Sequence, residues 1–96
     1  MNNTKMWEYW VCCESGNMDL LKEVHGQIKS IPSDIKQVGL EIACSCGNNN
    51  IVKYILKNMD SGDLDKETCV RIATKKSHMN VVTSLLADSF KHNPNF

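Results

Sequence analysis

Two cysteines that stand two residues apart are the first feature of this sequence that suggests chemistry. Cys44 and Cys46 lie in the stretch "IACSCGNNNIVKYIL", residues 42–56. A zinc site needs about four ligands that converge on one ion. Residues two apart on a helix point in directions about 200° apart, so these two thiols cannot both face one ion. We therefore expect structural thiols and no metal site.

The carboxylates and the known catalytic motifs give no stronger signal. The stretch "DSGDLD", residues 60–65, resembles the start of a calcium loop, but Arg71 stands at the twelfth position, where that loop needs a glutamate. A capped helix start explains these acids better. The sequence also lacks Gly-x-Ser-x-Gly, His-Glu-x-x-His and a phosphate-binding loop. We expect no enzymatic activity and no cofactor.

Composition narrows the class of protein. The 96 residues make one small domain, and 11 Lys and Arg balance 11 Asp and Glu, which argues against nucleic acid or an anionic membrane as a partner. No apolar run approaches the length of a membrane span, and the first residues do not read as an export signal. Five cysteines in such a chain predict reduced thiols. We expect a cytoplasmic protein, in the producing cell or in a host.

The sequence contains three copies of one repeat unit. Residues 9–24 (YWVCCESGNMDLLKEV), 40–55 (LEIACSCGNNNIVKYI) and 70–85 (VRIATKKSHMNVVTSL) align without a gap. Their starts are 40 − 9 = 31 and 70 − 40 = 30 residues apart. Apolar and small residues recur in the same columns, which is the signature of a repeat architecture.

Each unit is predicted to form two helices. In the second copy, apolar residues spaced by three and four predict an inner helix that carries Ile35, Val38, Ile42 and Cys46, with Ser33 or Asp34 as its N-cap. An amphipathic outer helix follows from about residue 51. In the third copy, Asp63 or Asp65 is the expected cap.

The turn between the two helices is marked by one residue in each copy. Gly16 and Gly47 end the first two inner helices, and Ser77 occupies the same column in the third copy. Serine in a left-handed conformation costs on the order of 1 kcal/mol relative to glycine, so the third turn is the least well specified.

These residues resemble the ankyrin repeat. "ACSCGNNNIVKYIL" is similar to the family's helix-turn-helix signature, and "ETCVRIA" matches the family's Thr-Pro-Leu-His-x-Ala at Thr68, Val70 and Ala73. The family's proline column holds Gly39 and Cys69. The resemblance implies an all-α, ankyrin-like solenoid of three helix-turn-helix repeats. Because the connections are shorter than in the family, we expect shortened or missing β-hairpins. The single domain would span 1–96, with repeats at about 4–31, 34–62 and 65–90 and a tail at 91–96.

The resemblance also assigns roles to individual side chains. It places Cys12, Cys13 and Cys44 in buried small-residue columns and leaves Cys46 exposed. His25 falls at a partly buried position of an outer helix. His78 falls at the family's Gly-His position, where a hydrogen bond that stabilises the turn is implied.

By the same resemblance, the inner helices line a concave face whose variable residues contact a partner protein. The face grades from acidic to basic along the repeats, which would orient a partner. We also include the column in which the family has histidine. The candidate partner-binding residues are Met6, Trp7, Trp10, Glu14, Ser15, Gln37, Glu41, Ser45, Cys46, Glu67, Arg71, Lys75 and Lys76.

Trp7 and Trp10 leave two interpretations open. They would either cap the end of the core or anchor a partner, since tryptophan is enriched at interface hot spots. For the whole protein, the first hypothesis is a protein-binding adaptor or inhibitor, and its size also suits a viral, phage or effector protein. The alternative is a self-associating module or homodimer, suggested by the apolar third outer helix with Met79, Leu86 and Phe90.

Overall fold

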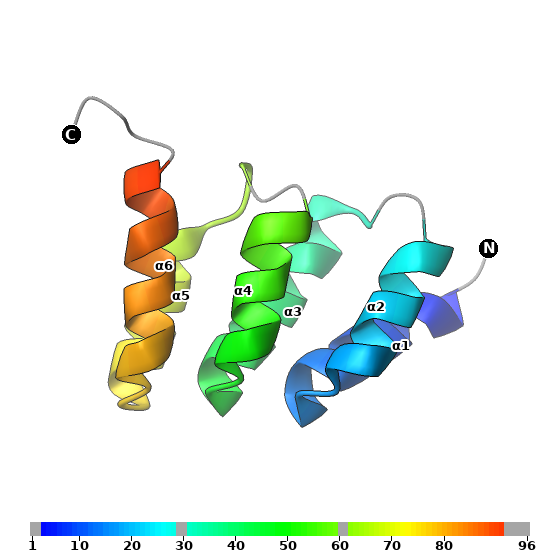
Figure 1. The fold of residues 1–96 in the computed structure, drawn as a ribbon, viewed down its shortest axis with the longest axis horizontal. Helices are drawn as coiled ribbons and strands as arrows, with labels where there is room; N and C mark the ends of the chain where they lie inside the picture. Colours follow the sequence, from blue (N-terminus) through cyan, green and yellow to red (C-terminus); the bar gives the residue numbers. More distant parts are fainter. Residues whose placement is uncertain (1–2, 29–30, 60–61, 92–96) are drawn as a thin grey trace.

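The computed structural model describes residues 3–28, 31–59 and 62–91, and these form six helices without a strand. Three antiparallel helix pairs stack side by side over 40 × 28 × 20 Å (Figure 1). The inner helices α1, α3 and α5 form one layer, and the outer helices α2, α4 and α6 form the other. The all-α repeat prediction is confirmed. The bounds are α1 Asn3–Ser15, α2 Met18–Gln27, α3 Ser33–Cys46, α4 Asn49–Asn58, α5 Lys66–Lys75 and α6 Met79–Lys91.

The core lies between the two layers and consists of the repeated apolar columns. The inner helices contribute small side chains, among them Cys13, Ala43 and Ala73, and the outer helices contribute larger aliphatic ones such as Ile55 and Leu85. Small residues let neighbouring inner helices approach closely, and the aliphatic residues fill the space between the layers. The thiols therefore act as small apolar residues in the core.

All three turns have the left-handed backbone that the repeat predicts. The φ angles are 75° at Gly16, 74° at Gly47 and 64° at Ser77. The residue after the turn then reaches back to the preceding repeat. Asn48 donates its amide to the carbonyl of Cys13 at 2.8 Å, and Nε2 of His78 lies 3.1 Å from the carbonyl of Ser45. The hydrogen bond of His78 thus joins two repeats rather than closing its own turn.

Replacing Ser77 with glycine is expected to raise the free energy of unfolding by about 1 kcal/mol, because glycine adopts positive φ without steric cost. Urea unfolding followed by circular dichroism measures this change. Gly47→Ala is the reverse control: its φ is 74° and an added Cβ would lie 2.7 Å from the His78 ring, so it should destabilise. An unchanged or lower stability for Ser77→Gly would contradict the prediction.

The helix starts follow the sequence prediction at α5 but not at α3. Asp65 is the N-cap of α5, where it accepts bonds from the backbone and hydroxyl of Thr68 that lower the pKa of its carboxyl. The prediction that Ser33 or Asp34 caps α3 is wrong, because the N-cap is Pro32 and has no side-chain bond. The Ser33 hydroxyl instead donates to Asp63, lowering the pKa of that carboxyl and tying the starts of two repeats together.

Candidate functional site

The layer of inner helices presents one repeated surface, which we call the inner face. Residues spaced by three, four and seven lie along one stripe of a helix. On α1 this stripe holds Trp7, Trp10, Val11 and Glu14. With the repeat offsets of 31 and 30, the equivalent columns on α3 and α5 are Val38, Glu41, Ile42 and Ser45, and Thr68, Arg71, Ile72 and Lys75.

The end of the inner face nearest the first repeat is apolar. The Trp7 side chain is 65% exposed, and Val11 and Val38 are also exposed. A depression of about 230 Å³ lies here, which we call the indole pocket; its lining residues are Trp7, Trp10, Val11, Glu14 and Ile42. The apolar spacing placed Val38 and Ile42 on α3, and neither was predicted to bind a partner. Val38 is nevertheless exposed, and apolar spacing alone gave no signal that this stripe opens to solvent.

The two indoles differ in their surroundings. Trp10 is half-buried against the core, and its Nε1–H donates to the carbonyl of Ile35 on α3 at 3.0 Å. Trp7 has most of its surface in solvent. Trp10 therefore packs as a structural residue, while Trp7 has surface available for contact.

Gln37 and Glu41, which were also predicted to bind a partner, form hydrogen bonds within the chain. The Gln37 amide donates to the Glu41 carboxylate at 2.7 Å, and it exchanges two hydrogen bonds of 2.8 and 3.1 Å with the backbone of Asp65. Gln37 thus fastens α3 to the start of α5, and Glu41 helps to orient it. These interactions give both side chains a structural role.

The remaining predicted residues divide by exposure. Met6 and Ser45 are half-buried. The exposed members are Glu14, Ser15, Cys46, Glu67, Arg71, Lys75 and Lys76. The exposed residues of the third repeat include three cations, Arg71, Lys75 and Lys76, whereas the first repeat presents Glu14. The opposite charges thus lie at the two ends of the inner face.

The five free cysteines separate into one exposed thiol and four buried thiols. Cys46 is exposed, and Cys12, Cys13, Cys44 and Cys69 are buried. Burial raises the pKa of Cys13 to about 12, and it also raises the pKa of Cys12. A hydrogen bond with Cys69, together with burial, raises the pKa of Cys44. Within the described residues, no cluster of His, Cys, Asp or Glu is arranged to hold a metal ion.

A bulky maleimide is expected to label one thiol in the native protein and all five after denaturation, because attack requires an accessible thiolate. Mass spectrometry of the labelled protein counts the adducts, and peptide mapping should place the native one at Cys46. A Cys46→Ser variant serves as the control and should stay unlabelled until it unfolds. Native protection of Cys46, or native labelling of Cys13, would contradict the prediction.

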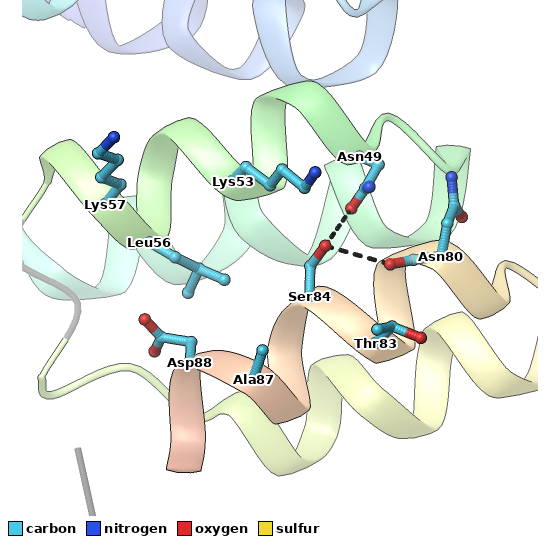
Figure 2. A pocket seen from close by; sticks show the side chains of 9 residues that line it. All are labelled: Asn49, Lys53, Leu56, Lys57, Asn80, Thr83, Ser84, Ala87 and Asp88. Carbon is cyan, nitrogen blue, oxygen red and sulfur yellow. Dashed lines mark hydrogen bonds between the residues drawn. The ribbon is translucent and has the colours of Figure 1, made fainter. Parts of the chain in front are cut away.

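A larger groove runs between α4 and α6 on the outer layer (Figure 2). Its volume is about 770 Å³, and it is lined by Asn49, Lys53, Leu56, Lys57, Asn80, Thr83, Ser84, Ala87 and Asp88. The Ser84 hydroxyl lies 2.8 Å from Oδ1 of Asn49 and 3.1 Å from the carbonyl of Asn80. None of the nine described residues that line the groove is a histidine or a cysteine. This lining offers hydrogen-bonding and charged groups.

Contacts between the outer helices α2 and α4 involve His25. This half-buried imidazole places Nδ1 2.8 Å from the Tyr54 hydroxyl, and the two rings meet edge to face with centroids 5.6 Å apart. The prediction of a partly buried histidine on an outer helix is confirmed. None of the six helices, within their described residues, is long and apolar enough to cross a membrane.

Comparison with known families identifies the type of this repeat. A family model for ankyrin repeats matches residues 9–95 in three copies. The chain belongs to the ankyrin repeat family. Neither a curated protein nor a solved structure gives a significant match. Ankyrin repeats generally mediate protein–protein interactions, and the family is typically non-catalytic. The exposed surfaces of this ankyrin repeat protein are therefore the places to look for its function.

Proposed function

We propose that this ankyrin repeat protein is a non-catalytic adaptor or inhibitor that holds one partner protein on its inner face. The observation that carries the proposal is the apolar stripe of Trp7, Val11 and Val38, which is exposed on a face with charged residues at both ends. An exposed tryptophan within an apolar stripe is typical of the centre of an interface. A bound partner buries such a centre, and polar residues form the rim around it.

The charges at the two ends support one orientation of the partner. Glu14 is exposed in the first repeat, and Lys75 and Lys76 are exposed in the third. Arg71, beside the lysines, is paired at 3.6 Å with Glu67 across one helical turn. A partner with the opposite gradient would be steered into a single register, because complementary potentials fix orientation and raise the association rate.

The double variant Lys75→Glu with Lys76→Glu is expected to weaken partner binding about tenfold, which corresponds to about 1.4 kcal/mol. Trp7→Ala should cause a loss of at least the same size, since aromatic anchors dominate interfaces. Stability should stay within about 0.5 kcal/mol for the lysine changes, as for other surface substitutions.

The wild type and the two inner-face variants are each used as bait in a pull-down from the native cell or host. Proteins that the wild type captures and that neither variant captures are then purified, and their affinities are measured by titration calorimetry. Lys22→Glu on the exposed side of α2 is the charge-matched control and should bind like the wild type. A complex that is indifferent to both inner-face changes would overturn the proposal.

Self-association is a second candidate, favoured by the exposed apolar residues of α6. Met79 is 58% exposed and Leu86 is 43% exposed on this helix, and exposed apolar side chains can pack against a second copy of the chain. Sedimentation equilibrium at micromolar concentration would detect a dimer. Met79→Glu with Leu86→Glu should return such a dimer to a monomer, and a strictly monomeric wild type would exclude this candidate.

We further propose that the protein acts in the cytoplasm, either of the cell that produces it or of a host. Five free cysteines support a reducing compartment. A non-catalytic binding face would suit an effector, phage or viral inhibitor.

A further inference from the structure

The indole pocket has a composition that selects its ligand. Two of its five lining residues are Trp7 and Trp10, which are the only tryptophans in the chain. Its volume of about 230 Å³ lies below the roughly 300–1,000 Å³ of pockets for whole small molecules, so it fits a single side chain. We propose that the indole pocket binds a cationic side chain of the partner, either an arginine guanidinium or a lysine ammonium. This inference rests on the proposed function of the inner face and specifies the chemistry of one end of it.

The aromatic walls favour a cation. The face of an indole carries a partial negative charge and attracts ammonium and guanidinium groups more strongly than other aromatic side chains do. Trp7 and Trp10 stand three residues apart on α1, which places them on neighbouring directions of the same helix surface. A cationic group in the pocket would therefore meet two indoles.

One of these walls is fixed before any ligand arrives. The bond from Nε1 of Trp10 to the carbonyl of Ile35, 3.0 Å long, anchors the Trp10 ring to α3. A side chain that is already held loses little conformational freedom on binding. Val11 and Ile42 complete the lining with aliphatic surface, which suits the methylene stem of an arginine or lysine.

The charge of the pocket excludes the main alternatives. Among the described residues that line it, Glu14 alone is ionisable, and it is exposed one helical turn after Trp10. A carboxylate beside a cation gives a charge-assisted hydrogen bond. A purely apolar ligand would remove water from the carboxylate without replacing its hydrogen bonds, and an acidic ligand would be repelled.

The two tryptophans make the pocket directly observable, because both indole N–H resonances of the chain come from its lining. The ¹⁵N-labelled protein is titrated with N-acetylarginine methylamide, and in parallel with the lysine, citrulline and leucine analogues, at matched ionic strength. Citrulline has nearly the shape of arginine but no charge. The arginine and lysine probes should shift the indole resonances at least about threefold more per unit concentration than the two neutral probes.

Glu14→Gln keeps the shape of the side chain and removes its charge. It should reduce the response to the cationic probes to nearly that of citrulline, whereas Glu23→Gln, at an exposed glutamate on the outer helix α2, should leave it unchanged. Equal shifts from leucine and arginine would show an apolar pocket and overturn the assignment. Absence of shifts with every probe would overturn it as well.

The probe titration and the capture experiment can fail separately. If the cationic probes bind no better than the neutral ones while both inner-face variants lose the partner, only the assignment of the indole pocket falls. If the cationic probes bind selectively but the inner-face variants bind the partner as tightly as the wild type does, the proposed function is refuted. The assignment of the indole pocket as a cation site then still holds.

Discussion

Replacing Gly39 with alanine is expected to lower the free energy of unfolding by about 3 kcal/mol, the upper end of the cost of overpacking a core. Gly39 lies in α3 directly against Tyr9 of α1. A Cβ at this position would stand 2.3 Å from Cε2 and 2.5 Å from Cζ of the tyrosine ring. Tyr9 is fully buried, and its hydroxyl donates to the carbonyl of Lys36 at 3.0 Å. The ring cannot move away without breaking this bond or opening the core.

Gly26→Ala is the matched control for this change. Gly26 also lies in a helix, α2, but nothing stands within 4 Å of the place its Cβ would take. Alanine there should stabilise the protein by up to about 1 kcal/mol through helix propensity alone. Urea unfolding of the two variants separates the steric effect from propensity. A Gly39→Ala variant as stable as the wild type would show that α1 and α3 are less tightly packed than described.

The second large effect is expected at the ion pair between α5 and α6. Lys66 Nζ lies 2.7 Å from Asp88 Oδ2, and the two side chains are only 13% and 10% exposed. Asp88→Ala would leave the lysine charge partly buried without this partner, so we expect a loss of about 2–3 kcal/mol in the free energy of unfolding.

An exposed pair in the same repeat provides the control. Arg71 Nη1 and Glu67 Oε1 are 3.6 Å apart, and their side chains are 69% and 83% exposed. Glu67→Gln should cost no more than about 0.5 kcal/mol, because water and salt screen such pairs. The double variant Lys66→Met with Asp88→Leu should regain most of the stability lost in Asp88→Ala, since it leaves no unpaired charge. Equal losses for Asp88→Ala and Glu67→Gln would contradict the role of burial.

Local features of the fold could be predicted from the sequence. Apolar spacing by three and four predicted the helices, and the column of Gly16, Gly47 and Ser77 predicted the left-handed turns. Asp65 was a predicted cap, and Cys44 and Cys46 were predicted to face opposite ways. Each of these depends on a residue and its neighbours within about one helical turn, where backbone sterics and helix geometry decide the outcome.

Relations between repeats required the tertiary structure. Periodicity shows that Val11 and Val38 lie on an apolar stripe, but whether another element covers that stripe depends on how far apart the helices stand. The sequence likewise could not show that Trp10 is structural and Trp7 is exposed. The hydrogen bond that fixes Trp10 goes to the carbonyl of Ile35 on α3, which is distant in the chain.

The same limit applies to the polar contacts. The sequence predicted that Gln37 binds a partner. In the structure its side-chain amide forms hydrogen bonds with the backbone of Asp65, 28 residues away. The sequence alone determined the repeats, their helices and their turns, because those depend on local geometry. Tertiary packing decided which side chains remain exposed for a partner, because exposure is set by neighbours that are distant in the chain.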